Sequence, residues 1–189
     1  MGRLWRAAGM GLVLILLCSD WTSAMTDIME GAEVQADPEA VKAIVATFDR
    51  AEEALRTESL SGIMFIYSKA YRNRGLRKED TSRIWEDLFA RYNQLSSWHL
   101  FSKIVVDREK ATARVICTGG LFGVSVLEKE GKPFPTALSA SGGAEPIHID
   151  VWFEAIHYLV LEDGAWRIIG HDPAGGEKEP FGASIHLLF

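Results

Sequence analysis

The chain has 189 residues, of which 26 are acidic and 20 are Lys or Arg, so its formal net charge is −6 at neutral pH. An acidic chain without a dense run of Lys and Arg argues against a nucleic-acid partner, because phosphate binding draws its affinity from clustered positive charge. Only two cysteines are present and one lies in the leader described next, so the mature chain has neither an internal disulfide nor a cysteine-based metal site.

Residues 1–24 have the features of a signal peptide. A basic start is followed by an apolar run from Gly9 to Cys18, and Thr22-Ser23-Ala24 supplies the small residues of a cleavage site. The run is shorter than the roughly 20 apolar residues that span a membrane. The sequence therefore predicts an exported protein, periplasmic or secreted, with no membrane contact after cleavage. Retention of the segment as an anchor and acylation of Cys18 are the alternatives, although Leu17 stands where acylation favours a small residue.

Residues 25–36 are polar, acidic and without periodicity, and they predict a flexible lead-in. A single domain is expected over residues 37–174, followed by a tail over 175–189. Asp37 and Pro38 open its first helix, because Asp is a good N-cap and Pro is tolerated at the first helical position. Apolar residues at three-and-four spacing continue this helix to Leu55. Glu52 is expected on its solvent-exposed side.

Two more helices are predicted, over residues 59–72 and 80–92. The first of them carries Tyr67 and Tyr71 one turn apart, so that both side chains share a face. The second carries Trp85 within a stripe of apolar and aromatic residues at helical spacing. Such an aromatic stripe is more typical of a core than of a cofactor site.

From residue 98 onward the hydrophobic period becomes that of β-strands. Residues 98–106 and 111–118 predict an antiparallel pair, residues 121–127 a further strand, and residues 136–146 a loop rich in Ser, Gly and Ala. Cys117, inside the second run, is expected to be a small buried hydrophobic residue.

Residues 148–172 predict a long hairpin that turns at Asp163-Gly164. A two-residue Asp-Gly loop favours the type I′ turn, because both central residues accept a positive φ. This turn places Leu161 opposite Trp166, and His157 opposite Gly170.

Both faces of this hairpin are largely apolar, which is typical of a sheet covered on both sides or closed around a pocket. The side chains of one face include Phe153, His157, Trp166 and Asp172, and those of the other include Trp152, Glu154, Tyr158 and His171.

His157 and Asp172 are the candidate catalytic pair. In the predicted register they lie diagonally across the hairpin on the face of Trp166. A carboxylate beside an imidazole fixes its tautomer and raises its basicity, which prepares the ring for proton transfer. Tyr67 or Tyr71, from the helix above, is the expected hydrogen-bond donor. The alternative is that the pair is a satisfied polar contact near a strand end.

The other candidate residues follow from the same two faces. The expected ligand-binding side chains are Tyr71, Trp85, Phe153 and Trp166. On the second face Glu154 and His171 form a similar pair, which is interpreted as a surface or interface contact. Neither the histidines nor the glycines show metal-ligand or phosphate-loop spacing, so no metal and no cofactor are expected.

The order of these elements resembles the nuclear transport factor 2-like (NTF2-like) superfamily, in particular its SnoaL-like branch of polyketide cyclases, ketosteroid isomerases and dehydratases. The matching segments are residues 41–55, Tyr67-Ser68-Lys69-Ala70-Tyr71, residues 101–106 with 111–115, and residues 162–168. The resemblance implies an α+β, cone-shaped (cystatin-like) fold in which three N-terminal helices pack on a curved antiparallel β-sheet. It further implies an apolar cavity between the two layers, and frequently a homodimer through the outer sheet face.

Three hypotheses on function follow. The first is an exported protein that binds a small hydrophobic molecule in an apolar cavity without transforming it. The second is a SnoaL-like lyase or isomerase that uses His157 and Asp172 as an acid/base pair. The third is a non-catalytic dimerisation or interaction module that makes its contacts through the sheet face and the apolar residues 185–189.

Overall fold

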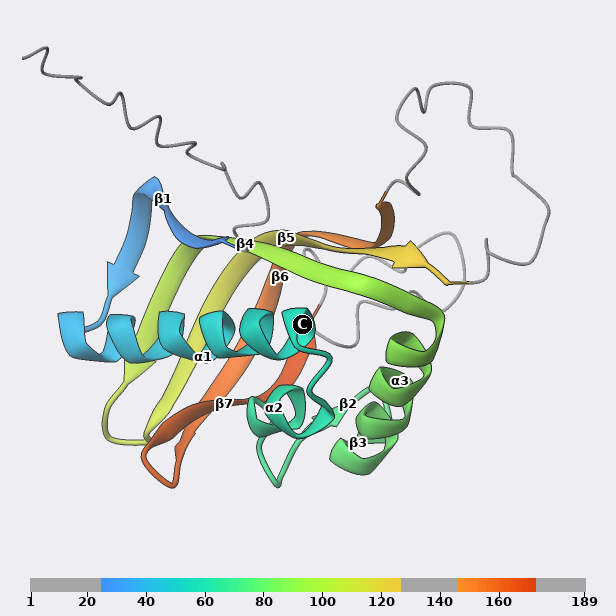
Figure 1. Cartoon of the computed structure of the whole chain (residues 1–189). Coiled ribbons are helices and arrows are strands. Elements are labelled where there is room, and N and C mark those ends of the chain that lie inside the picture. The colour runs from blue at the N-terminus through green and yellow to red at the C-terminus, as the bar shows by residue number, and fades with distance from the viewer. Residues whose placement is uncertain (1–24, 127–145, 173–189) are drawn as a thin grey trace, which may run out of the picture.

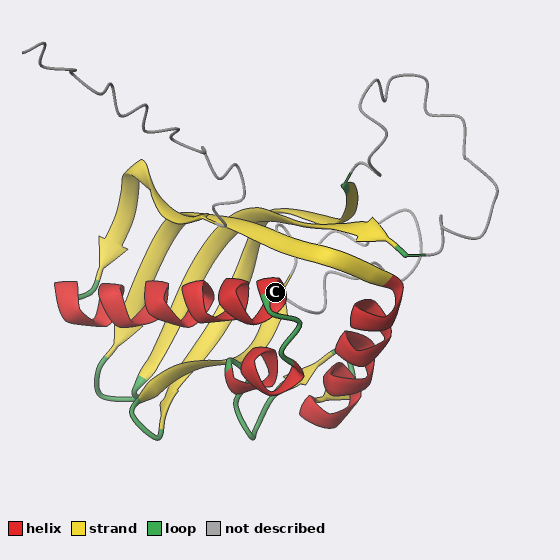
Figure 2. Ribbon diagram, in the orientation of Figure 1, coloured by secondary structure: helices red, strands yellow, loops and turns green. Residues whose placement is uncertain are grey.

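A curved sheet of five strands carries the helices on its concave side in the computed structural model of the chain, which describes residues 25–126 and 146–172 (Figures 1 and 2). The spatial order of the strands is β1 (Met25–Gln35), β4 (Tyr92–Asp107), β5 (Thr112–Ser125), β6 (Ile147–Glu162) and β7 (Ala165–Asp172). The helices are α1 (Pro38–Arg56), α2 (Leu60–Phe65) and α3 (Lys78–Arg91), and a short hairpin of β2 (Arg72–Asn73) and β3 (Leu76–Arg77) separates α2 from α3. The α+β class and the curved sheet agree with the sequence prediction.

The sheet is mixed rather than antiparallel. Neighbouring strands from β4 to β7 run antiparallel, whereas β1 runs parallel to β4. The prediction of a flexible lead-in over residues 25–36 was therefore wrong. The strand escapes detection because it lies at the sheet edge and bulges between Ile28 and Glu33, where Gly31 has a φ of 81°, so no regular alternation survives in the sequence.

The first helix begins where the sequence predicts. The Asp37 side chain accepts a hydrogen bond from the backbone N–H of Ala40 at 3.0 Å, and Pro38 occupies the first turn. The apolar stripe faces the sheet, with Ile44, Phe48 and Leu55 fully buried. The core of the molecule therefore lies between α1 and the concave side of the sheet.

The second helix is shorter than predicted, since α2 ends at Phe65 rather than near residue 72. The backbone of the next residues pairs with β7 instead: Ile168 N–H donates to the Ile66 carbonyl at 2.7 Å, and Ser68 N–H donates to the Ile168 carbonyl at 2.9 Å. These hydrogen bonds come from a strand about a hundred residues away in the sequence, so helical periodicity alone could not reveal them.

The β6–β7 turn has the predicted conformation, with φ of 53° at Asp163 and 76° at Gly164. The predicted register holds from Leu161 opposite Trp166 to Leu159 opposite Ile168. Beyond that point β7 contains one extra residue, so His157 lies opposite His171 instead of Gly170. This bulge reverses which side chains of β7 face the core.

A second irregularity changes the faces of β6. Ala155 pairs with Cys117 and Trp152 with Gly119, so two residues of β6 oppose one residue of β5, and Glu154 adopts a φ of 50°. As a result Trp152 is buried and Phe153 is 72% exposed, the reverse of the predicted arrangement.

Three predictions concern residues outside the described part of the chain: the signal peptide over 1–24, most of the loop over 136–146, and the tail over 175–189. Among the helices that the structure describes, none combines the length and the apolarity needed to cross a membrane.

Candidate functional site

His157 and His171 meet on the concave face of the sheet. Their Nδ1 atoms are 2.9 Å apart and both side chains are buried. One imidazole must donate its Nδ1 proton while the other accepts it. Burial lowers the pKa of His157 to about 3, so the ring is neutral near pH 7. The Nε2 atom of His157 is buried and has no hydrogen-bond partner within the described residues.

The predicted pair of His157 with Asp172 does not form. Because of the β7 bulge, Asp172 lies opposite Ile156, is exposed, and accepts a hydrogen bond from the Tyr158 hydroxyl at 2.9 Å. The same bulge turns His171 inward, so the predicted pair of Glu154 with His171 does not form either. Glu154 is exposed.

The two predicted tyrosines do lie on this inner face. Tyr67 and Tyr71 are fully buried with their rings edge to face, and the Tyr71 ring lies 5.8 Å from that of His171, measured between centroids. The Tyr67 hydroxyl accepts a hydrogen bond from Nε1 of Trp85 at 2.9 Å. Burial raises the pKa of Tyr71 to about 12 and that of Tyr67 well above its usual value, so both keep their protons near pH 7.

Glu52 has a buried carboxyl group. The prediction that this residue lies on the solvent-exposed side of α1 was therefore wrong. Its side chain is only 4% exposed, and its Oε1 accepts a hydrogen bond from the Thr26 hydroxyl of β1 at 3.2 Å. Burial raises the pKa of Glu52 to about 7, and the nearby charge of Asp49 adds to the rise. The signal that could have found it is its position one turn after Phe48, on the edge of the buried stripe.

Another buried histidine, His99 of β4, lies beside Cys117 of β5. Nδ1 of His99 is 3.6 Å from the Cys117 sulfur, which also accepts a hydrogen bond from Nε1 of Trp152 at 3.5 Å. Cys117 is fully buried, as expected from the sequence, and burial raises the pKa of its thiol to about 12. The Phe48 ring contacts both His99 and His157 and thus lies between these two histidines.

A surface groove opens between the first turns of α1 and the ends of the strands, and we call it the α1 groove. Its volume is about 320 Å³. The lining residues are Asp37, Glu39, Ala40, Ala43, Val106, Arg108, Ala111, Leu161 and Trp166. Trp166, a predicted ligand-binding residue, contributes to this lining, whereas Phe153 lies elsewhere, on the exposed part of β6.

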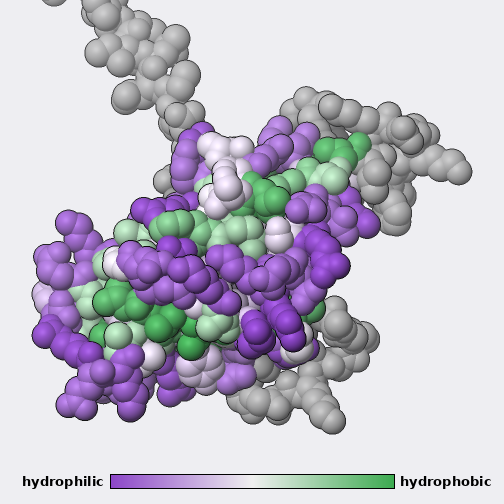
Figure 3. Space-filling model, turned by 90° about the horizontal axis from the view of Figure 1, so that it is seen from below, coloured by the Kyte–Doolittle hydropathy of each residue, from purple (hydrophilic) through white to green (hydrophobic). Residues whose placement is uncertain are grey.

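Charged and apolar groups are combined in the α1 groove. Arg108 and Asp37 form an ion pair at 2.6 Å, while Leu161 is 44% exposed in the free chain. Figure 3 shows hydrophobic side chains at the surface on the face seen from below, bordered by hydrophilic ones. Within the described ranges, no three His, Cys, Asp or Glu side chains are grouped so that they could hold a metal ion.

Comparison with known proteins gives similarity in structure and not in sequence. No family model matches the chain, and no curated protein matches its sequence. Among solved structures, a protein from Novosphingobium aromaticivorans, described as a candidate aromatic ring hydroxylase, aligns with a TM-score of 0.54 and 11% identity over 72% of this chain and 89% of its own. The protein Aln2 from a Streptomyces species aligns with a TM-score of 0.52 and 13% identity over 72% of this chain and 90% of its own.

A member of the NTF2-like family from Streptomyces avermitilis is also similar, with a TM-score of 0.48 and 12% identity over 71% of this chain and 95% of its own. At such low identities a structural likeness shows the fold and leaves the activity open. The arrangement of helices on a curved sheet is the one predicted from the sequence, but the sheet is mixed and not antiparallel.

Proposed function

We propose that this chain, which has the NTF2-like fold, binds a small hydrophobic molecule in the α1 groove. The observation that carries the proposal is the groove itself, with a volume of about 320 Å³ and a lining that includes Trp166, Leu161 and Val106. Small-molecule sites are typically concave, mostly apolar and roughly 300–1,000 Å³ in volume, with a few polar groups that orient the ligand. The α1 groove fits this description at the lower end of the size range, which suits a small ligand.

The exposed part of Leu161 supplies a driving force for binding. An aliphatic side chain that is 44% exposed gains roughly 1 kcal/mol when a ligand removes it from water. The Asp37–Arg108 ion pair offers polar atoms to a hydroxyl or carbonyl group of the ligand. We therefore expect an apolar molecule with one such group.

Binding is better supported than acid/base catalysis. The catalytic hypothesis needs a carboxylate beside His157, but Asp172 is bonded to Tyr158 instead. A buried imidazole with a pKa of about 3 is a weak base near neutral pH. His157 is thus poorly suited to removing a proton.

The proposal includes export. The predicted signal peptide over residues 1–24 would deliver the domain to the periplasm or the outside of the cell, where a carrier for a hydrophobic molecule could act. A fusion of residues 1–24 to a reporter enzyme that is active only after export would test this part by itself.

The α1 groove can be tested by filling it. Ala43 is exposed and lines the groove, and Ala46 is an exposed alanine one turn further along α1 that does not line it. The Ala43→Phe and Ala46→Phe variants would be titrated with N-phenylnaphthylamine, an uncharged dye that fluoresces in apolar sites. We expect Ala43→Phe to weaken binding at least tenfold, which is about 1.4 kcal/mol, and Ala46→Phe to bind as the original chain does. Equal binding by both variants, or no saturable binding by the original chain, would refute the proposal.

A further inference from the structure

A second groove lies on the convex face of the sheet, and we call it the Arg114 groove. Its volume is about 290 Å³, and its lining includes Val105, Arg114, Tyr158 and Ile169. Arg114 and Tyr158 are the chain neighbours of Val115 and His157, which are fully buried on the concave side. Successive residues of a strand point to opposite faces of the sheet. The Arg114 groove is therefore on the side of the sheet that the described helices leave uncovered (Figure 2).

The Arg114 groove is separate from the α1 groove. The two grooves have no lining residue in common. Val105 lines the Arg114 groove, whereas Val106, the next residue of β4, lines the α1 groove on the other face. A ligand in one groove therefore leaves the other groove open.

Arg114 is flanked by apolar side chains. It is exposed, and it lies directly opposite Val105 of β4 on one side and Tyr158 of β6 on the other. Directly opposed residues of an antiparallel pair have their Cβ atoms about 5 Å apart. The groove thus presents a positive charge between an aliphatic and an aromatic side chain.

The guanidinium of Arg114 forms no ion pair within the described part of the chain. Asp107 lines the same groove, but its carboxylate pairs with Lys110 at 2.7 Å. Asp172 accepts a hydrogen bond from the Tyr158 hydroxyl at 2.9 Å. Because these two carboxylates are bonded to other groups, the guanidinium keeps its donors for a ligand.

We propose that the Arg114 groove binds an apolar molecule with one carboxylate group, and that it is a second ligand site of the chain. The planar guanidinium donates two parallel hydrogen bonds to the carboxylate oxygens, a geometry that suits its fork of N–H groups. The apolar body of the ligand contacts Val105, the Tyr158 ring and Ile169. The net charge of −6 repels anions in general, so selective binding of an anion reports a local site of this kind.

The charge of the ligand can be varied on one ring system. Calorimetric titrations near pH 7 would compare naphthoate, naphthylmethanol and naphthylmethylammonium, which are anionic, neutral and cationic. We expect naphthoate to bind at least tenfold more tightly than naphthylmethanol, which is about 1.4 kcal/mol, and the cation to bind most weakly. Equal binding of naphthoate and naphthylmethanol, or no saturable binding of naphthoate, would overturn the proposal.

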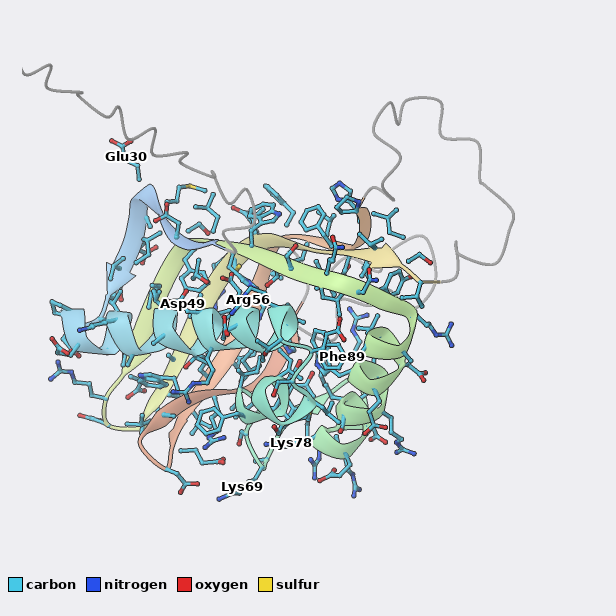
Figure 4. The ribbon with its side chains drawn as sticks, in the orientation of Figure 1. Glu30, Asp49, Arg56, Lys69, Lys78 and Phe89 are labelled. Atoms are coloured by element: carbon cyan, nitrogen blue, oxygen red, sulfur yellow. The ribbon has the colours of Figure 1, made fainter. Side chains whose placement is uncertain are left out.

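Three variants locate the site. Arg114→Gln should weaken naphthoate binding at least tenfold and leave naphthylmethanol binding unchanged, and Arg114→Lys, which keeps the charge without the planar fork, should recover part of the affinity. Arg56→Gln is the matched control, because it removes one exposed guanidinium from α1, on the other side of the sheet (Figure 4). A preference for naphthoate that survives Arg114→Gln, or disappears in Arg56→Gln, contradicts the assignment.

A second copy of the chain is the competing occupant of this face. It would have to bring a carboxylate to Arg114, because an unpaired guanidinium is costly to bury. Sedimentation with and without naphthoate distinguishes the two occupants, and we expect one naphthoate per chain and no change in assembly. A dimer that binds no naphthoate and that Arg114→Glu dissociates would assign the face to pairing between copies and overturn the proposal.

Failure of this proposal and of the proposed function can be told apart. Arg114→Gln should leave the binding of N-phenylnaphthylamine unchanged, whereas Ala43→Phe fills the α1 groove and should leave naphthoate binding unchanged. The α1 groove also contains an arginine, Arg108, which pairs with Asp37. Loss of naphthoate binding in Ala43→Phe and not in Arg114→Gln would place the carboxylate in the α1 groove and overturn the assignment to Arg114.

Discussion

His157 and His171 face each other across β6 and β7 with their Nδ1 atoms 2.9 Å apart, and this contact exists only because β7 contains a bulge. Without the bulge His157 would face Gly170, and His171 would point to the outer side of the sheet. The extra residue thus replaces the predicted imidazole–carboxylate pair with a contact between two imidazole rings. This exchange lowers the expected basicity of the inner face and favours binding over proton transfer.

The His157–His171 contact predicts acid sensitivity. Burial lowers the folded-state pKa of His157 from 6.5 to about 3, so the unfolded chain takes up the proton first as the pH falls. The free energy of unfolding is therefore expected to fall between about pH 6.5 and pH 3. His157→Leu should be less stable than the original chain near pH 7 by about 2 kcal/mol, because the hydrogen bond between His157 and His171 is lost, but it should lose less stability on acidification.

Urea unfolding at a series of pH values measures this slope. His148→Leu is the control, since His148 is an exposed residue of the same strand and its replacement should leave the slope unchanged. An unchanged acid slope in His157→Leu would show that His157 is not the group responsible.

Glu52 predicts the opposite dependence on pH. Its folded-state pKa is raised from 4.5 to about 7, so its contribution to stability is complete below about pH 4.5 and is lost as the pH rises through 7. Glu52→Gln should therefore be more stable than the original chain near pH 8, on the order of 2 kcal/mol, and nearly equal to it near pH 4. Thermal unfolding at the two pH values checks this, and a Glu52→Gln variant that is less stable near pH 8 would contradict the burial argument.

Arg167 of β7 contacts Phe65, the last residue of α2. Its Nη1 donates to the Phe65 carbonyl at 2.6 Å, and its guanidinium lies over the Phe65 ring at 4.1 Å. Lys has no planar group that can both stack and bond in this geometry, so Arg167→Lys should cost about 2 kcal/mol in unfolding free energy.

Arg50 offers a matched control for this substitution. Its guanidinium lies over the same Phe65 ring at 4.4 Å, but the residue is exposed. Arg50→Lys should change the unfolding free energy by less than about 0.5 kcal/mol. Similar costs for the two variants would mean that the buried position of Arg167 adds nothing.

Replacing Asp172 should change the pKa of Tyr158 and leave the two buried histidines of this hairpin, His157 and His171, unaffected. The hydrogen bond to Asp172 raises the pKa of Tyr158 above 10, so Asp172→Asn should lower this pKa towards its usual value. The surface position of the pair limits the loss of stability to less than about 1 kcal/mol. Ultraviolet titration of the tyrosinate, with Tyr158→Phe as the reference, reports the shift. A change in the imidazole NMR signals of His157 in Asp172→Asn would instead favour the predicted His157–Asp172 pair.

Much of the fold could be predicted because its signals are local. The N-cap at Asp37 and the turn at Asp163-Gly164 each depend on the conformation of a few adjacent residues. The apolar residues of α1 recur at helical spacing, and this spacing indicates which side of the helix packs against the sheet. The candidate site was predicted less well. Tyr67 and Tyr71 lie on the inner face as expected, whereas Phe153 and Asp172 were expected there and are exposed, and Glu52 was assigned to solvent and is buried.

The sequence by itself determined the fold class, the opening of α1, the tight turn of the last hairpin and the buried character of Cys117, because propensity, period and positive φ are properties of neighbouring residues. Only the tertiary structure decided that residues 25–35 form a strand over Glu52, and that His171 rather than Asp172 meets His157. The physical reason is that an edge strand and a bulge are set by hydrogen bonds between distant segments. One residue inserted in a strand exchanges its faces without changing the pattern of the residues around it.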